Sequence, residues 1–139
     1  MTISGFDHVA MPVERTEAVI EFYKQLGFAI VGEEAWRNGD AVQFALQFGD
    51  NKINVHPPAR WTDPAFTLRG PAARPGCGDF CFVWDGSVAD VMAMLDRAGA
   101  VIELGPVRRE GGRNGGTAVG TSVYTRDPDG NLLEFIVYE

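Results

Sequence analysis

The sequence has little cysteine and no long hydrophobic run. Its two cysteines, Cys77 and Cys81, are too few for a disulfide framework or a complete zinc–cysteine site, so reduced thiols are expected. No apolar stretch reaches membrane-spanning length, and residues 1–4 show neither the basic region nor the apolar block of a secretory signal. We therefore expect a soluble, cytoplasmic protein that does not enter a membrane.

Basic charge is also scarce, with 12 Lys and Arg against 19 Asp and Glu and a formal net charge of −7. Nucleic-acid binding is disfavoured because it depends on basic patches. The one basic cluster, Arg108, Arg109 and Arg113, lies in the glycine-rich segment 108–116, which lacks the Gly-Lys-Ser/Thr ending of a phosphate loop. We expect a solvated loop there. The alternative is a mobile lid whose arginines meet an anionic substrate.

The pattern of the first half predicts the order βαβββ. A strand over residues 5–13 precedes a helix for which Thr16 is the expected N-cap and Gly27 the end, because Val19, Phe22, Tyr23 and Leu26 recur at helical spacing. Three further strands are predicted, at residues 28–31, 41–48 and 52–56.

The same order then recurs. After a proline-rich linker (58–75), the pattern predicts a strand over 79–84, a helix capped by Ser87 that ends at Gly99, and three strands, at 101–104, 122–126 and 132–138. With 139 residues the chain suits one domain. We therefore predict a single α+β domain made of two βαβββ modules, 4–57 and 76–139.

Superposing the two halves by their turns places Asn54 on Glu134 and His8 beside Asp79. Four polar side chains thus occupy equivalent places on the first and last strands of the modules. Glu134 stands among apolar residues in a predicted interior strand, where an ionised carboxylate needs a cation, a set of hydrogen bonds or a proton.

Three segments resemble the vicinal oxygen chelate superfamily, which includes glyoxalase I, extradiol dioxygenases and bleomycin-resistance proteins. They are Asp7-His8-Val9, the stretch Phe22-Tyr-Lys-Gln-Leu-Gly-Phe28, and Asp127-Pro-Asp-Gly-Asn-Leu-Leu-Glu134. The resemblance implies that the modules form a half-open curved sheet, that a divalent metal is held by residues of their first and last strands, and that the protein is a homodimer. It makes His8 and Glu134 the expected metal ligands.

His56 and Asp79 complete the candidate ligand set, with Asn54 as a weaker candidate. His56 follows Asn54 by two residues and so shares its strand face. Imidazole and carboxylate together suit Ni, Zn, Fe(II), Mn or Co, and the sequence does not choose among them. The structural alternatives are a hydrogen-bonded His8 and an Asp79 that accepts a backbone hydrogen bond. Cys81 is expected to be a small buried residue rather than a nucleophile, since no base accompanies it.

Two functions follow from these residues. The first is a metal-dependent enzyme, a lyase similar to lactoylglutathione lyase, an isomerase or a dioxygenase, that acts on a small substrate with vicinal oxygens. In this hypothesis Glu134 is catalytic, because a carboxylate with a raised pKa could also abstract a proton next to a carbonyl. The alternative is a metal-free protein that sequesters a small molecule, as bleomycin-resistance proteins do.

Overall fold

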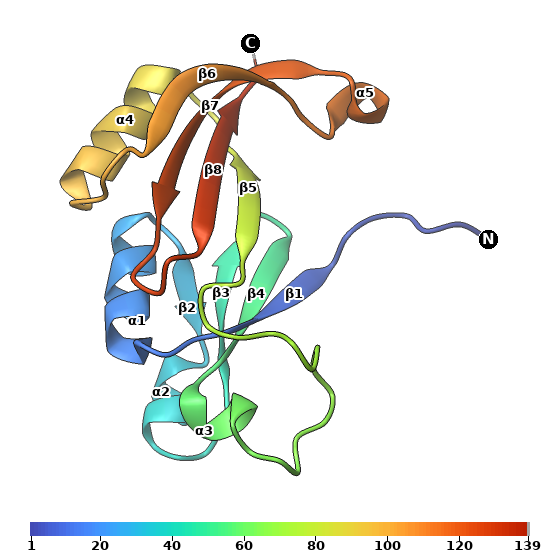
Figure 1. Ribbon diagram of the computed structural model, residues 1–139, viewed down its shortest axis with the longest axis vertical. Helices are drawn as coiled ribbons and strands as arrows, with labels where there is room; N and C mark the ends of the chain where they lie inside the picture. The colour runs from blue at the N-terminus through green and yellow to red at the C-terminus, as the bar shows by residue number, and fades with distance from the viewer. Residues whose placement is uncertain (139) are drawn as a thin grey trace. The chain divides into compact units, whose positions relative to one another are not determined.

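The computed structural model places residues 1–138 in two compact units that meet between Gly76 and Cys77 in the sequence (Figure 1). Each unit has its own four-stranded sheet and its own helices. The α+β class and the two sheet modules predicted from the sequence are confirmed. None of the helices in residues 1–138 is long and apolar enough to cross a bilayer.

The first unit contains the predicted βαβββ order with two additional short helices. Its elements are β1 (His8–Pro12), α1 (Thr16–Gln25), β2 (Ala29–Val31), α2 (Glu33–Arg37), β3 (Phe44–Phe48), β4 (Asn51–His56) and α3 (Pro58–Trp61). The strand order is β1-β4-β3-β2, with β1 parallel to β4 and the other pairs antiparallel.

Helix α1 forms because three of its residues, Val19, Ile20 and Tyr23, make one apolar stripe that is fully buried. Its start differs from the prediction. Thr16 is the first helical residue, Arg15 holds the N-cap position, and no side chain caps the helix. Gly27 follows the helix with a φ of 93°, a conformation that glycine adopts at little cost.

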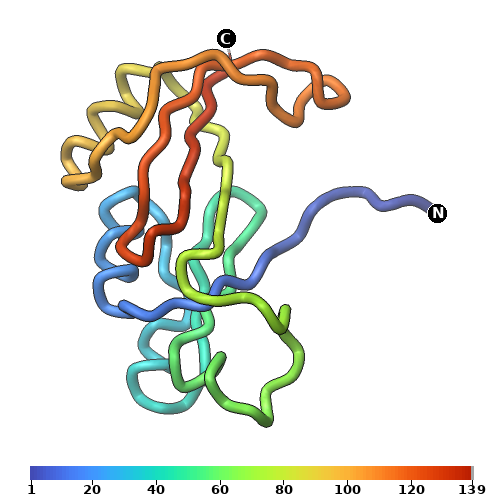
Figure 2. The backbone as a smooth tube through the Cα atoms, in the orientation of Figure 1, coloured from blue at the N-terminus to red at the C-terminus, as the bar shows by residue number. Residues whose placement is uncertain are grey.

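The two extra helices were missed because each is only about one turn long. Helix α2 follows Gly32, which has a φ of 81°. Helix α3 lies in the segment predicted as a linker, and its first residue is Pro58, which suits a first helical position because that position needs no N–H donor. Beyond α3 the chain runs through a wide loop to residue 76 (Figure 2).

The second unit repeats the order. Its elements are β5 (Asp79–Val83), α4 (Val88–Arg97), β6 (Leu104–Glu110), α5 (Arg113–Gly116), β7 (Val119–Arg126) and β8 (Leu132–Val137). The strand order is β5-β8-β7-β6, with β5 parallel to β8. Ser87 caps α4 as predicted: its Oγ accepts from the Asp90 backbone N–H, and the Asp90 carboxylate accepts from the Ser87 N–H.

Strand β6 was predicted too early and too short. It begins at Leu104 rather than Val101 and runs to Glu110, so Arg108 and Arg109 lie on a strand and not in the expected loop. The interruption that hid it is Gly105-Pro106, where the register against β7 shifts. A Cβ on Gly105 would meet the Ser122 carbonyl oxygen at 2.5 Å, so the bulge requires glycine.

The pairing registers confirm the superposition of the two halves. His8 pairs with Lys52 across β1 and β4, and Asp79 pairs with Leu132 across β5 and β8. Two residues further on, Ala10 pairs with Asn54 and Cys81 with Glu134. His8 and Asp79, and likewise Asn54 and Glu134, therefore occupy equivalent places.

Each unit has a core made by its long helix and one face of its sheet. In the second unit Val91 and Leu95 of α4 are fully buried together with Leu133 and Val123, and α4 contacts β7. Successive strand residues point to opposite faces. Glu134 therefore lies on the face opposite Leu133, away from this core.

Candidate functional site

Glu134 lies on β8, a strand with neighbours on both sides, and it is partly exposed. Its register partners are Cys81 on β5 and Tyr124 on β7, so three side chains able to exchange protons stand side by side on one face. The Ser122 hydroxyl donates to Oε1 of Glu134 over 2.6 Å. This hydrogen bond from the neighbouring strand β7 orients the Glu134 carboxylate.

Tyr124 connects Glu134 to an arginine. Nε of Arg109 donates to the Tyr124 hydroxyl oxygen over 3.1 Å, and the guanidinium carbon lies 5.7 Å from the centre of the ring. The pKa of Tyr124 is raised, chiefly by burial; the hydrogen bond from Arg109 opposes this, and the charge of Glu134 adds to it. The phenol therefore stays protonated at neutral pH and can donate a hydrogen bond.

Cys81 is exposed, which differs from the buried position expected of it. Partial burial, first, and then the nearby charges of Glu134 and Asp79 raise the pKa of its thiol to about 12. Because the thiolate is the nucleophilic form, this raised pKa disfavours a nucleophilic role for Cys81, which stays a prediction. We call Cys81, Glu134, Ser122, Tyr124 and Arg109 the Glu134 row.

Asp79 opens β5 on the same face, two residues before Cys81, and is exposed. Sequence reasoning found Asp79 and Glu134 and named Arg109 only as a lid residue of the alternative hypothesis, but it missed Ser122 and Tyr124. A signal was present for both of them. Ser122 and Tyr124 alternate along a predicted strand, so both had to share one face of the sheet.

In the first unit His8 is half exposed, and its Nδ1 donates to the Asp7 carboxylate over 2.5 Å. In the neutral tautomer that carries its proton at Nδ1, Nε2 keeps its lone pair, which is the arrangement that a metal-binding histidine uses. Asn54 is on the neighbouring strand, two residues past the register partner of His8. His8 and Asn54, the two candidate metal ligands of this unit, thus lie diagonally across adjacent strands.

His56 is at the far end of the same strand pair. It pairs with Pro12, four residues beyond His8, which corresponds to about 13 Å along the strands. His56 is buried, with 6% of its surface exposed, and the centre of its ring lies 5.2 Å from the centre of the Phe66 ring. Burial, first, and then the charges of Arg60 and Arg69 lower its pKa. The structure does not bring the two histidines together, and two nearby cations oppose a metal at His56.

The donors suit a divalent cation in kind, since they include one imidazole and two carboxylates. Each unit by itself supplies only two candidate ligands, His8 and Asn54 in the first unit and Asp79 and Glu134 in the second. Within residues 1–138 no three His, Cys, Asp or Glu side chains form a group able to hold a metal. A metal site usually takes at least three protein ligands, so neither pair alone completes one.

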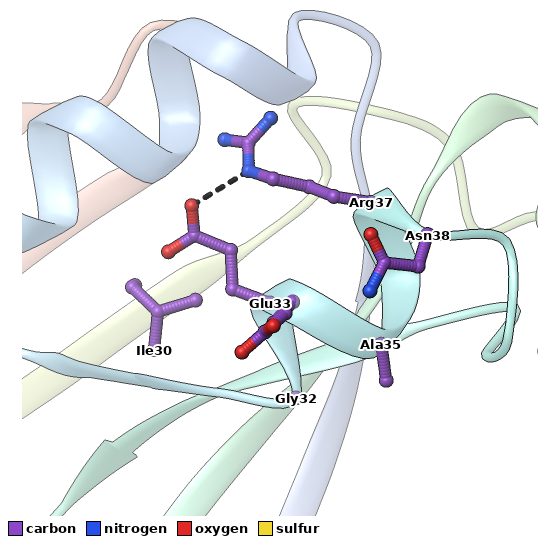
Figure 3. Close-up of a pocket in the computed structure, with 7 residues that line it drawn as sticks. Ile30, Gly32, Glu33, Ala35, Arg37 and Asn38 are labelled. Carbon is purple, nitrogen blue, oxygen red and sulfur yellow. Dashed lines mark hydrogen bonds and ion pairs between the residues drawn. The ribbon is translucent and has the colours of Figure 1, made fainter.

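A hollow of about 460 Å³ in the first unit is lined by α2 and residues next to it, both polar and apolar (Figure 3). The Glu33 carboxylate forms salt bridges with Lys24 and with Arg37, each over 2.8 Å. Arg37 forms a second salt bridge, with Glu17. These four charges neutralise one another across α1 and α2. We therefore interpret these side chains as a structural ion-pair network that joins α1 to α2, and not as a ligand site.

Two βαβββ modules with matching register define the fold class of this chain. Residues 5–135 match the family model of the Glyoxalase/Bleomycin resistance protein/Dioxygenase superfamily. The chain belongs to this superfamily.

Two relatives match the whole chain. The glyoxalase domain-containing protein RDO1 of Mycosarcoma maydis is 33% identical, over 100% of this chain and 71% of RDO1. Virulence protein STM3117 of Salmonella typhimurium is 35% identical, over 99% of this chain and 87% of that protein. The crystal structure of STM3117 has a TM-score of 0.82, with 100% of both chains covered.

Two more distant structures share the fold alone. A lactoylglutathione lyase from Agrobacterium tumefaciens is 20% identical, with a TM-score of 0.68 and coverage of 99% of this chain and 96% of the lyase. The antibiotic-binding protein TnmS3 from Streptomyces is 19% identical, also with a TM-score of 0.68, and covers 100% of this chain and 99% of TnmS3. The fold is therefore compatible with both catalysis and binding.

Proposed function

We propose that this protein is a metal-dependent enzyme that acts on a small substrate with vicinal oxygens. The observation that carries the proposal is the setting of Glu134. Its carboxylate sits on an interior strand among hydroxyl and thiol neighbours, and no Lys, Arg or His within residues 1–138 forms a salt bridge with it. A carboxylate so placed is available to a cation or to a proton.

His8 and Glu134 are the ligands we expect, with Asp79 as a further carboxylate. Asp7 supports His8 by accepting from Nδ1, and Ser122 supports Glu134 by donating to Oε1. His56 remains a prediction, weakened by the two arginines beside it. When bound, a divalent metal supplies a Lewis acid that polarises the substrate oxygens.

The side chains around Glu134 have separate tasks in this proposal. Glu134 accepts a proton or holds the metal, while Ser122 fixes the direction of its carboxylate. Tyr124, kept protonated by its raised pKa and positioned by Arg109, donates to negative charge that develops on the substrate. Cys81 remains a thiol and takes no nucleophilic part.

The test is the thermal shift of protein purified without a histidine tag, titrated with Ni(II), Zn(II), Fe(II), Mn(II) or Co(II). Binding to the folded state should add about 2.7 kcal/mol of stability at a metal concentration one hundred times the dissociation constant. His8→Ala and Glu134→Ala should lose most of this gain without losing the apo fold. Glu110→Ala, which removes an exposed carboxylate from β6, is the matched control and should keep it.

A second candidate is a metal-free protein that sequesters a small molecule. It is favoured by one observation, that neither unit alone offers three metal ligands among the described residues. The shared fold with an antibiotic-binding protein is compatible with it. If the parent and the double variant of His8 and Glu134 bind all five metals equally weakly, the sequestering function replaces the enzyme.

We also propose that the protein is a homodimer. Superfamilies of this kind commonly assemble about a two-fold axis. Within each unit the outer strands of the sheet pair on one side only, and such edges are suited to further pairing or covering.

A further inference from the structure

Four side chains of the first unit form a positively charged cluster at the end of β4. His56 is the last residue of β4, Arg60 lies on α3, and Phe66 and Arg69 lie in the loop that follows, which runs beyond α3 in Figures 1 and 2. We call these four residues the His56 cluster. None of them belongs to the Glu134 row.

Phe66 holds two members of the cluster in place. The guanidinium carbon of Arg60 lies 3.6 Å from the centre of the Phe66 ring, close enough for a strong cation–π contact. The His56 ring meets the same Phe66 ring edge-on, at 84° and 5.2 Å. One aromatic ring therefore fixes both a guanidinium and an imidazole.

Arg69 is held separately. It donates to the backbone oxygen of Ala73, and its guanidinium carbon lies 5.7 Å from the Trp61 ring. Trp61 is itself fixed, because its Nε1 donates to the Val13 oxygen over 2.9 Å. Aromatic rings and backbone thus position both arginines, without any carboxylate.

The charges of the cluster are unpaired. Within residues 1–138 neither Arg60 nor Arg69 forms a salt bridge, whereas Arg37 and Arg126 both do. Nε of Arg60 is buried and has no hydrogen-bond partner. A buried donor without a partner destabilises the folded state, so a partner at this guanidinium would be stabilising.

No acidic side chain of the loop supplies that partner. Asp63 is the only acidic residue among residues 57–76, and its carboxylate accepts from the Ala65 backbone N–H over 2.9 Å. The whole chain has a formal charge of −7, so this local concentration of positive charge runs against the overall balance. Such a concentration draws anions to one place on an acidic protein.

We infer that the His56 cluster binds an anionic group, a carboxylate or a phosphate, of a small-molecule ligand. Arg60 and Arg69 supply the charge, and the flat guanidinium matches both groups by paired hydrogen bonds. The His56 ring packs edge-on against Phe66, close enough to both arginines to feel their charge. The inference goes beyond the proposed function and does not depend on a bound metal.

The experiment uses the full chain, stripped of metal with EDTA and then dialysed free of EDTA, and follows the ring signals of its two histidines by NMR. Inorganic phosphate and, separately, acetate are added at constant ionic strength. His56 should shift with a saturable response, whereas His8, outside the cluster, should not follow it. A response to phosphate alone or to acetate alone assigns the anionic group.

Arginine variants locate the binding. Arg60→Gln and Arg69→Gln should each weaken the apparent affinity at least fivefold. Arg74→Gln, which removes an exposed arginine from the same loop, is the matched control and should bind like the parent. Circular dichroism checks each fold.

The inference is overturned if neither anion shifts His56, if His8 shifts in parallel, or if Arg74→Gln weakens binding as much as the other two variants. Should a glutamine variant fail to fold, the parent protein still decides the question through the contrast between its two histidines. Because the metal is removed by EDTA, failure here leaves the proposed metal chemistry untouched.

Discussion

At the scale of single residues, one carboxylate influences two weak acids. The charge of Glu134 contributes to the raised pKa of Cys81 and to that of Tyr124, in both cases after burial. Both groups therefore stay protonated where an isolated thiol or phenol would begin to ionise. Within the Glu134 row, the thiol of Cys81 and the hydroxyls of Ser122 and Tyr124 are thus neutral groups beside one carboxylate.

Alkylation of the two cysteines tests this reading. We expect iodoacetamide at pH 8 to modify Cys77 well before Cys81, although both are exposed, because the thiolate is the reacting form. Glu134→Gln removes a charge that disfavours the thiolate, so the pKa of Cys81 should fall. Its thiolate fraction should then rise about tenfold for each pKa unit lost, and its alkylation should quicken by a smaller factor, because a thiolate of lower pKa is a weaker nucleophile. Mass spectrometry of the two cysteine peptides gives both rates.

The control for this measurement is Glu103→Gln, which removes a carboxylate that pairs with Arg126 in the same unit. It should leave Cys81 unchanged. Equal rates for Cys81 in the parent and in Glu134→Gln would mean that the charge of Glu134 does not protect the thiol.

The sequence predicted the residues that stand out by type and position, and missed those whose role depends on pairing. His8 and Glu134 stood out because of motifs and because a carboxylate among apolar residues is costly. Arg60 and Arg69 did not, since their approach to His56 depends on how an irregular, proline-rich loop folds back. Arg109 was hidden because β6 was misplaced.

At the scale of elements, the two long helices start in different ways. Helix α4 has a complete capping box, whereas α1 has no side-chain cap. Ser87→Ala should therefore lower the free energy of unfolding by about 1 kcal/mol. Thr16→Ala, at the start of α1, should change it by less than about 0.5 kcal/mol.

Urea unfolding of the two variants beside the parent measures both changes. The comparison is matched because each variant removes a hydroxyl near the start of a ten-residue helix. Similar losses in the two variants would show that the capping box contributes nothing specific to α4.

The predicted elements were most accurate where periodicity was long. Helices α1 and α4 and strands β5 and β8 agree with their predicted ranges to within a few residues. One-turn helices carry too few residues to show a period, and β6 contains Gly105-Pro106, which interrupts the alternation expected of a strand. Local sequence rules fail at such points because pairing with β7 decides the conformation.

At the scale of the whole molecule, the proposed homodimer can be measured directly. Light scattering at micromolar concentration should give twice the chain mass of 15.1 kDa. Dilution should lower the mass toward that of one chain if the association is reversible. A mass of one chain at every concentration would contradict the dimer.

The matching registers of the two sheets also bear on the ancestry of the gene. A tandem duplication of a half-length coding sequence would leave this kind of correspondence, in which His8 is equivalent to Asp79 and Asn54 to Glu134. After such a duplication each copy mutates on its own. The second unit has the carboxylate of Glu134 where the first unit has the amide of Asn54. The first unit has Arg60 and Arg69 in the segment that follows its last strand. Inheritance in two copies thus lets selection alter the recognition of a ligand in one half while the other half keeps its chemistry.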